Sequence, residues 1–248
     1  MGASAGVGVV SQVGLRPYME DRYALAEEAG GLFGGVYDGH GGASAAALAA
    51  AELHREFFQA VEDGLAPEAA FLKAYAAMDR ATGHLQHCGT TAATFFLRGN
   101  QPVVAHVGDA RIILVSTDTT EQLTEDHRVD HPRERQRILG AGGEIEDPYV
   151  MRGEYGLMPT RGLGDAWFRP VGAIATPDVA SRVLRASDLY LIAATDGLWD
   201  VLDNERVGEI TRLAPDARRA AAALAKAAFG AGTTDNLTVL VVPLGARR

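Results

Sequence analysis

Acidic residues recur along this 248-residue chain at the ends of apolar runs or in the turns beside them. They occur in the pairs Glu20-Asp21, Asp38-Gly39, Gly108-Asp109, Glu125-Asp126, Gly164-Asp165, Asp196-Gly197 and Asp235-Asn236. A single acid of this kind is an ordinary turn residue. Several acids that converge in space raise one another's pKa, unless cations offset their mutual repulsion. Because oxygen ligands without a cysteine–histidine cluster suit Mg²⁺ or Mn²⁺, the pattern predicts a divalent-cation site if folding gathers these acids.

Strands and helices must bring the acids together, and the hydrophobic pattern predicts both kinds of element. We expect strands at residues 7–10, 23–26, 31–37, 90–97, 102–107, 111–115, 188–194 and 236–242. We expect helices at residues 45–58, from Pro67 onward, and at 131–139, 204–213 and 216–229. Two of the strands are separated only by Gly108-Asp109-Ala110, which is typical of a hairpin. Runs of strands divided by blocks of helix predict antiparallel sheets packed face to face, with helices on the outside.

The composition is that of one globular domain spanning residues 1–248. Hydrophobic residues make up 47% of the chain and charged residues 22%, so a sizeable buried core is feasible. The net charge of -9 argues against DNA or RNA as a ligand, because a nucleic-acid backbone is itself negative. No appended interaction domain is visible in the sequence, so we expect a monomer.

Three sequence features indicate a cytoplasmic protein. Cys88 is the only cysteine, so no disulfide can form within the chain, which fits a reducing compartment. The opening Met1-Gly2-Ala3-Ser4 lacks the basic and apolar regions of a secretory signal. No run of about 18 apolar residues occurs that could span a membrane. We therefore predict a cytoplasmic location and no membrane partner.

The turns that carry the acids lie within longer motifs that are specific enough to suggest a family. The motifs are Arg16-Pro17-Tyr18-Met19-Glu20-Asp21, Val36-Tyr37-Asp38-Gly39-His40-Gly41-Gly42, Cys88-Gly89-Thr90-Thr91-Ala92, Gly108-Asp109-Ala110-Arg111, Thr124-Glu125-Asp126-His127, Arg161-Gly162-Leu163-Gly164-Asp165, Thr195-Asp196-Gly197-Leu198-Trp199-Asp200 and Thr234-Asp235-Asn236. In this order they resemble the motif series of the metal-dependent serine/threonine protein phosphatases of type 2C. The resemblance runs from about Val7 to Val242, and an ordered series is a stronger signal than any one short motif.

The resemblance implies both a fold and an activity. The fold would be an α+β, four-layer α-β-β-α sandwich of two antiparallel sheets flanked by helices, with a metal cluster at one end between the sheets. The activity would be the hydrolysis of phosphoserine and phosphothreonine, with phosphorylated proteins as the substrates. The cofactors would be Mn²⁺ or Mg²⁺, with two core ions and a third, weaker one.

The resemblance also assigns the core metal ligands. Asp38 would bridge the two core ions, and Asp196 and Asp235 would complete the two sites. The supporting ligands, direct or through water, would be Glu20, Asp21 and the carbonyl group of Gly39. A glycine suits that position because, without a Cβ atom, it lets a cation approach the backbone.

The remaining acids have different expected roles. Asp126 and Asp200 match the acids that, together with Asp196, hold the third ion in this family. Asp109, in contrast, resembles a structural acid in its turn. Asp165 has the chemistry of a metal ligand, but its glycine-flanked motif favours a role in shaping a loop beside the site.

The expected mechanism needs no covalent protein nucleophile. Two cations about 3.5 to 4 Å apart can bind one water between them, lower its pKa and aim it in line at phosphorus. Arg16 would clamp the phosphate oxygens, because its planar guanidinium donates a parallel pair of hydrogen bonds. His40 would protonate the departing serine or threonine oxygen, because histidine titrates near neutral pH.

Residues 128–160 match the position of the family's flap, a variable element beside the catalytic groove. The segment carries many charges, among them Arg133, Glu134, Arg135 and Arg137. It is therefore either a substrate-selecting element or a solvated helix with its turns. Met158-Pro159-Thr160, just before Arg161, differs from the usual sequence of the family. The resemblance therefore does not predict the geometry of the flap at this point.

Some residue patterns also fit other interpretations. His84, His87 and Cys88 suggest a soft-metal site, but they lack a fourth ligand at usable spacing, so a structural role is favoured. Residues 39–42 are not a dinucleotide loop, because Ser44 replaces the third glycine and no parallel βαβ repeat follows. Two functional alternatives stay open: a catalytically silent phosphatase-like binding module and a different two-metal hydrolase such as a nuclease. The complete set of acids disfavours the first, and the lack of a basic stripe disfavours the second.

Overall fold

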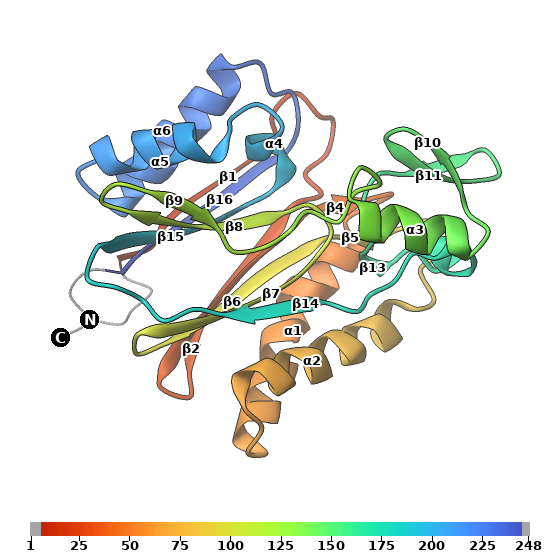
Figure 1. Cartoon of the computed structure of the whole chain (residues 1–248), viewed down its shortest axis with the longest axis horizontal. Coiled ribbons are helices and arrows are strands. Elements are labelled where there is room, and N and C mark those ends of the chain that lie inside the picture. The colour runs from red at the N-terminus through yellow and green to blue at the C-terminus, as the bar shows by residue number, and fades with distance from the viewer. Residues whose placement is uncertain (1–5, 245–248) are drawn as a thin grey trace.

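The centre of the molecule is a pair of five-stranded antiparallel sheets packed face to face (Figure 1). The structure is a computed structural model, and it describes residues 6–244. The first sheet has the order β1 (Gly8–Gln12), β16 (Leu237–Pro243), β15 (Asp188–Ala194), β8 (Arg111–Ser116) and β9 (Thr120–Gln122). The second sheet has the order β14 (Asp178–Ser181), β7 (Gln101–Val107), β6 (Ala92–Arg98), β3 (Gly31–Tyr37) and β2 (Arg22–Glu28).

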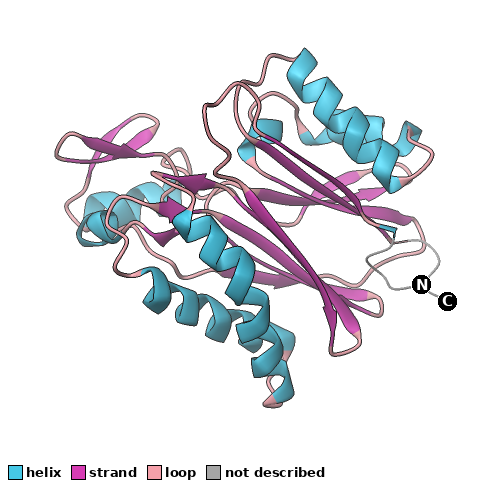
Figure 2. Cartoon of the chain, turned by 180° about the vertical axis from the view of Figure 1, so that it is seen from behind, coloured by secondary structure: helices cyan, strands magenta, loops and turns pink. Residues whose placement is uncertain are grey.

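Helices cover the outer face of each sheet (Figure 2). Those on the second sheet are α1 (Ser44–Glu62) and α2 (Pro67–Thr82), and those on the first are α5 (Asn204–Leu213) and α6 (Ala217–Gly230). Local chemistry sets the helix starts. Pro67 occupies the first turn of α2, and the side chains of Asp203 and Asp216 accept hydrogen bonds from backbone N–H groups in the first turns of α5 and α6. The predicted α+β, four-layer α-β-β-α sandwich is confirmed.

Apolar side chains fill both the space between the sheets and the space under the helices. Successive residues of β3 point to opposite faces, so Leu32 lies between the sheets while Phe33 lies under α1 and α2. The ring of Phe33 packs against those of Phe57 and Phe71 from the two helices, with centroids 5.5 and 5.9 Å away. Because both faces of this sheet are covered, its central strands read as continuous apolar runs in the sequence.

Residues 128–160, the segment predicted as a flap, fold beside the sandwich, at the right in Figure 1. The elements are α3 (Pro132–Gly140), β10 (Glu144–Glu146), β11 (Tyr149–Arg152) and β12 (Tyr155–Leu157). Their apolar cluster includes Ile138, Val150 and Phe168, the last from the 3₁₀ helix η2 (Ala166–Val171). A small sheet with the order β13 (Leu163–Gly164), β5 (Gly89–Thr90) and β4 (Gly39–His40) joins this region to the sandwich.

The hairpin predicted around Gly108-Asp109-Ala110 is wrong. The strands on either side, β7 and β8, belong to different sheets and do not pair with each other. The turn instead carries the chain from the second sheet to the first. A short spacing between two strands fixes only a tight turn, and it does not decide whether the second strand pairs with the first or crosses to the facing sheet. The crossing places Asp109 at the boundary between the two sheets.

Element boundaries were predicted best where the hydrophobic pattern is strongest. The bounds of β3, β15 and α5 agree with the predicted ranges, whereas the strand predicted at 90–97 is divided at Thr91 into β5 and β6. The strands β9, β10, β11, β12 and β14 were missed, because they are short and mostly polar or exposed.

Within residues 6–244, every helix is too short or too polar to cross a membrane. Met1-Gly2-Ala3-Ser4, which was interpreted as lacking a secretory signal, lies outside the described residues.

We expect Leu240→Ala to lower the free energy of unfolding by about 2–5 kcal/mol. Leu240 lies in β16 and is fully buried between the sheets, so the truncation removes apolar contacts and leaves a cavity. Denaturant unfolding followed by circular dichroism measures the loss. Leu213→Ala is the control, because Leu213 is 86% exposed, and its change should stay below about 0.5 kcal/mol. Equal losses in the two variants would contradict this core.

Candidate metal centre

Most of the predicted site residues line one cavity of about 380 Å³. Its acidic lining residues are Glu20, Asp38, Asp109, Asp196, Asp200 and Asp235. Arg16, Gly39 and His40 line it as well, and residues 128–160 contribute Tyr149, Gly156, Leu157, Met158 and Pro159. Asp21, Asp126 and Asp165 are not among the lining residues. Folding therefore brings together acids that lie near opposite ends of the chain.

Three strand ends deliver the central acids from both sheets. Asp38 directly follows β3 of the second sheet. Asp196 opens the short helix α4 (Asp196–Trp199), which follows the end of β15 in the first sheet. Asp235 lies just before the start of β16. Because β15 and β16 are antiparallel neighbours, the end of one lies beside the start of the other, which brings Asp196 and Asp235 to the same edge.

Burial and mutual repulsion raise the pKa of the clustered acids. The pKa of Asp38 is raised well above its ordinary value by burial and by the charges of Asp196 and Asp21. Burial is also the main cause that raises the pKa of Asp196 to about 7 and that of Asp21 to about 6. Without cations, the cluster therefore retains protons near neutral pH. Divalent ions would offset the charge and take the place of these protons.

Asp21 adds an unused oxygen to this cluster. The residue is 2% exposed, and its Oδ2 accepts a hydrogen bond from the hydroxyl of Thr195 at 2.8 Å. Its Oδ1 is buried without a hydrogen-bond partner among the residues that the structure describes. Such an oxygen is unfavourable unless water or a cation satisfies it. The orphaned oxygen and the all-carboxylate donor set both fit Mg²⁺ or Mn²⁺.

Asn236 positions the segment that carries Glu20. The backbone N–H of Glu20 donates to Oδ1 of Asn236 at 2.7 Å. The Nδ2 of Asn236 donates to the carbonyl oxygens of Val13 and Tyr18 at 2.8 and 3.0 Å. The Glu20 carboxylate in turn accepts from the backbone N–H of Gly42 at 2.6 Å. Asn236 belongs to one of the sequence motifs, but this role could not be predicted from the motif because the partners of Asn236 lie far away in the sequence.

Gly39 is needed for close packing as well. A Cβ atom at this position would lie 2.7 Å from the carbonyl oxygen of Glu20 and 3.1 Å from the Cβ of Ala46. The first distance is too short for any real side chain. Close packing is therefore a reason for glycine at this position that does not depend on metal binding. The approach of a cation to the Gly39 carbonyl is still a prediction.

Arg16 and His40 bring basic groups to the cavity. The Nη2 of Arg16 lies 2.6 Å from Oδ2 of Asp235, and the Arg16 side chain is 57% exposed. The Nε2 of His40 lies 2.9 and 2.8 Å from the two carboxylate oxygens of Asp165. Burial lowers the pKa of His40, but the Asp165 carboxylate outweighs this effect and raises the pKa above its ordinary value. Both groups thus face the cavity with a carboxylate partner.

Asp165 combines the predicted loop role with a contact that the sequence did not reveal. Its φ of 51° lies in the left-handed region, where a residue other than glycine is strained. Its N–H donates to the carbonyl oxygen of Cys88 at 3.1 Å. A Cβ atom on Gly89 would lie 2.0 Å from Oδ2 of Asp165, so glycine there makes room for the carboxylate. The loop is therefore built to hold Asp165 against His40.

The acids assigned to a third ion are already paired with arginines. The two oxygens of Asp126 accept from Arg111, at 3.0 Å from Nε and 2.6 Å from Nη2. Oδ1 of Asp200 accepts from Nη2 of Arg128 at 2.9 Å, and the same nitrogen lies 3.6 Å from Oδ2 of Asp196. Both oxygens of Asp126 and one oxygen of Asp200 therefore accept from arginine donors in this structure.

His87 and Cys88 take part in packing, as the favoured interpretation expected. The His87 ring packs at a tilt against those of Tyr155 and Trp167, with centroids 4.5 and 5.2 Å away. The thiol of Cys88 donates to the carbonyl oxygen of Gly42 at 3.2 Å. These contacts tie the loop after α2 to β12 and η2.

The structure also contains a histidine cluster that the sequence analysis missed. Ligand atoms of His106, His127 and Asp178 lie within 4.8 Å of one another, which is metal-ligand spacing. However, Nδ1 of His127 accepts from the N–H of Gly108 at 3.1 Å, so its Nε2 carries the proton and donates to Asp178 at 3.2 Å. Asp178 also pairs with Arg161 at 3.0 Å. The protein's own groups satisfy these atoms, and we interpret the cluster as structural.

Glu134 contradicts the interpretation of α3 as a merely solvated helix. The residue is fully buried, and its carboxylate accepts from Arg161, Arg137 and Thr160 at 2.6, 2.7 and 2.6 Å. A buried charge is stable only with such partners, and these bonds lower the pKa of Glu134 in spite of its burial. These bonds connect α3 to Thr160 and Arg161, which lie just before β13.

Comparison with known proteins relates this chain to one family. The family model described as "Protein phosphatase 2C" matches residues 18–237. "Probable protein phosphatase 2C 59" of Oryza sativa subsp. japonica is 34% identical over 245 residues, covering 95% of this chain and 74% of the relative. "Protein phosphatase 1K, mitochondrial" of Xenopus laevis is 34% identical over 260 residues, covering 97% of this chain and 68% of the relative.

Solved structures share the same architecture. The serine-threonine phosphatase 2C from Toxoplasma gondii superposes with a TM-score of 0.80 at 24% identity, covering 96% of this chain and 94% of that chain. A sex determining protein of C. elegans superposes with a TM-score of 0.87 at 24% identity, covering 96% of this chain and 64% of that chain. At this level of identity the likeness shows a common fold.

We expect Mn²⁺ to raise the thermal unfolding midpoint of the wild type, and Asp38→Asn to reduce that rise. At about 100 times its Kd, a bound ion stabilises the folded state by about 2.7 kcal/mol. Asp38 lies partly buried beside Asp196, and its raised pKa means that folding without metal must either protonate this carboxyl or hold its charge next to another acid. Asparagine removes that cost but also weakens the hold on the ion. The metal-free variant should therefore unfold at a higher temperature than the metal-free wild type. Thermal scans with chelator and with Mn²⁺ measure both effects.

The control for this experiment is Asp63→Asn. Asp63 pairs with Lys73 at 2.8 Å on the surface and does not line the cavity. It should follow the wild type with and without Mn²⁺. A shift induced by Mn²⁺ that is as large in Asp38→Asn as in the wild type would contradict the assignment of Asp38 as a ligand.

Proposed function

Because this chain belongs to the protein phosphatase 2C family and is a protein serine/threonine phosphatase, we propose that it hydrolyses phosphoserine and phosphothreonine in proteins with two divalent ions at the acid-lined cavity. The observation that carries the proposal is the convergence of Asp38, Asp196 and Asp235 from separate strand ends on a cavity that also contains an arginine and a histidine. The family is metal-dependent, and the oxygen donors fit Mn²⁺ or Mg²⁺.

We assign the core ions to the central acids. Asp38 would be shared by both ions, and Asp196 and Asp235 would complete the sites. The supporting groups would be the Gly39 carbonyl, Glu20 and Asp21. When bound, the ions activate a water molecule as the nucleophile and neutralise charge on the phosphate. The orphaned Oδ1 of Asp21 and the raised pKa values of the cluster support this assignment.

Arg16 binds the phosphate group in this proposal. Its guanidinium is largely exposed at the cavity and stays beside Asp235, 2.6 Å away, so a phosphate that enters the cavity comes within its reach. A planar guanidinium donates two parallel hydrogen bonds to phosphate oxygens, which fixes the orientation of the group. Arg16 thus holds the phosphorus atom in line for attack.

His40 donates a proton to the leaving oxygen. A serine or threonine alkoxide is a poor leaving group, so a positioned acid lowers the barrier. In the protonated imidazole both ring nitrogens carry hydrogen, so Nε2–H can hold Asp165 while the other N–H donates to substrate. The two bonds to Asp165 keep the ring at the cavity wall.

Residues 128–160 contact the protein substrate in this proposal. Tyr149, Leu157 and Met158 line the same cavity as Arg16 and the acids. A phosphorylated side chain that reaches the acids would bring its own backbone against these residues. The cytoplasmic location and the monomeric state expected from the sequence stay predictions.

The two alternative functions are less well supported. A catalytically silent module would lack ligands, but all the predicted core acids are present and lie at or beside the cavity. A nuclease would need a basic surface for a nucleic-acid backbone, and the chain has a net charge of -9.

Hydrolysis of p-nitrophenyl phosphate and of a phosphothreonine peptide with Mn²⁺ tests the proposal. We expect Asp38→Ala and Asp196→Ala each to lower kcat by roughly 10³-fold or more, because each removes a group that holds the ions. Asp63→Ala, at the surface and outside the cavity, is the control and should retain wild-type activity. Unchanged activity in Asp38→Ala would refute the site. Binding of Mn²⁺ without any hydrolysis would favour the silent module, and cleavage of nucleic acid alone would favour a nuclease.

The same two substrates also test whether His40 is the proton donor. We expect His40→Ala to lower kcat for the phosphothreonine peptide by roughly 10²-fold or more, but kcat for p-nitrophenyl phosphate by less than about 10-fold. The reason is that p-nitrophenolate leaves as a stable anion, whereas a threonine alkoxide needs a proton. His84→Ala, which changes an exposed histidine outside the cavity, is the control. Equal losses on both substrates would rule out His40 as the proton donor.

A further inference from the structure

The guanidinium group of Arg128 lies among three acids of the cavity. Its Nε donates to Oδ2 of Asp109 at 2.7 Å, and its Nη2 donates to Oδ1 of Asp200 at 2.9 Å. Nη2 also lies 3.6 Å from Oδ2 of Asp196. All three acids line the cavity, and the Arg128 side chain is 23% exposed. The cluster therefore contains a positive charge that does not come from solution.

We propose that Arg128 is a built-in cation of the metal centre, which takes the place of a third divalent ion, so that this chain binds two ions and not three. The inference rests on the proposed function, because it concerns acids that the proposal assigns to the metal centre. It departs from the third ion that the family resemblance implies.

Backbone hydrogen bonds fix the place from which the Arg128 side chain starts. The N–H of His127 donates to the carbonyl oxygen of Gly108 at 3.0 Å. The N–H of Thr160 donates to the carbonyl oxygen of His127 at 2.8 Å. Because Gly108 directly precedes Asp109, these bonds hold the base of Arg128 next to its main partner. The guanidinium needs no large movement of the chain to stay in the cluster.

Asp126 is held away from the cluster by a second arginine. Arg111 binds both oxygens of Asp126, in the bidentate arrangement that is the strongest for this pair of residues. Arg111 is itself fixed, since it donates to Oδ1 of Asn204 at 2.8 Å and its guanidinium lies 5.0 Å from the ring centre of Trp199. The acids that remain for a third ion are therefore the ones that Arg128 already contacts.

A third ion would have to displace Arg128, and three properties oppose this. Asp109 is buried and its Oδ2 accepts from Arg128, so an ion that displaced the guanidinium would have to bind this buried oxygen itself to replace the lost charge and donor. Burial lowers the pKa of Arg128, but the charges of Asp109 and Asp200 outweigh this and raise the pKa above its ordinary value, so the group stays charged. The side chain is also tethered, so its presence does not depend on the concentration of free metal.

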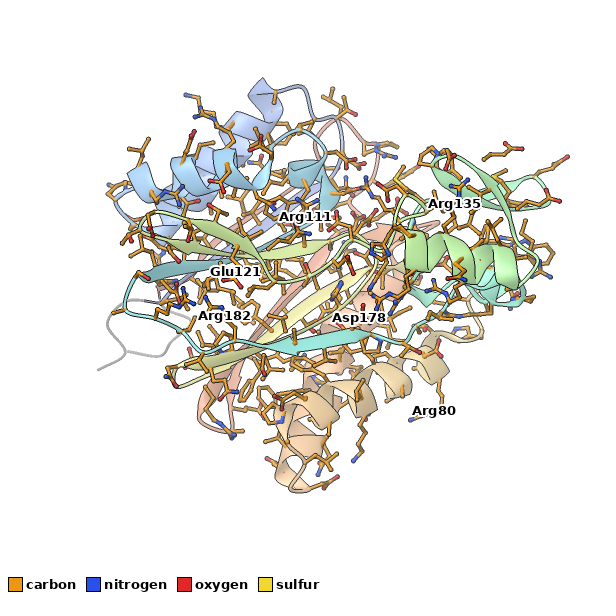
Figure 3. The ribbon with its side chains drawn as sticks, viewed as in Figure 1. Arg80, Arg111, Glu121, Arg135, Asp178 and Arg182 are labelled. Atoms are coloured by element: carbon orange, nitrogen blue, oxygen red, sulfur yellow. The ribbon has the colours of Figure 1, made fainter. Side chains whose placement is uncertain are left out.

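The number of Mn²⁺ ions bound per chain tests this inference. Equilibrium dialysis at saturating Mn²⁺, with the metal counted by atomic absorption, should give two ions for the wild type and three for Arg128→Ala. Arg182→Ala is the matched control: its side chain is 21% exposed and pairs with Glu121 at 2.8 Å, on the side of the molecule away from α3 (Figure 3). This control should bind two ions.

A second variant keeps the test valid if Arg128→Ala does not fold, which circular dichroism would reveal. Arg128→Gln removes the charge but keeps an amide donor for the buried Asp109 carboxylate, and it should also bind three ions. Three ions in the wild type, or two in a folded Arg128 variant, would overturn the inference and leave the proposed phosphatase intact. No bound Mn²⁺ in the wild type would overturn the inference together with the metal centre on which it rests.

Discussion

The central constraint on this molecule is the repulsion among carboxylates that lie together at the edge of a packed core. Asp21 is buried, and Asp38 and Asp196 are partly buried, so water screens their charges poorly and their pKa values rise in the absence of cations. A fold that brings these groups together must provide positive charge, accept protons or bind metal. Here, part of the positive charge comes from the chain itself, through the guanidinium groups of Arg16 and Arg128. The negative charge that these two arginines do not offset is the reason to expect divalent ions.

The sandwich meets this constraint by placing the acids at strand ends rather than within strands. A strand held by neighbours on both sides is a rigid support, so the residue just beyond its end has a defined position. The end of β15 and the start of β16 are adjacent because the strands are antiparallel, and β3 delivers Asp38 from the facing sheet. Asn236 then fastens the segment before β2 to the same edge through three hydrogen bonds. Backbone geometry, more than side-chain flexibility, thus determines where the acids meet.

The sequence predicted most of the strands and helices, because their hydrophobic pattern is local. Apolar runs of the length of a strand, such as those of β3 and β15, favour buried strands, and their bounds were predicted correctly. The errors lie where local sequence leaves the choice to distant contacts. The spacing around Gly108 fits a hairpin, yet β7 and β8 lie in different sheets. In these sheets β7 pairs with β6 and β14, and β8 pairs with β15 and β9. Likewise, the sequence around Glu134 suggests a solvated charge on a helix, but in the fold Glu134 is buried and accepts hydrogen bonds from Arg161 and Thr160.

The sequence by itself determined which kinds of groups are available and in what order: a series of acids at predicted strand ends, an arginine and a histidine in ordered motifs, and too little basic charge for a nucleic acid. The ordered motifs that contain these groups suffice for the family, and the acids are of the type that the proposed metal chemistry needs. The tertiary structure alone decided the partners: Arg111 with Asp126, Arg128 with Asp109 and Asp200, and Asp165 with His40. The reason is that a charge–charge contact depends on distances of a few ångströms between residues far apart in the chain, and only the packing of sheets and helices sets those distances.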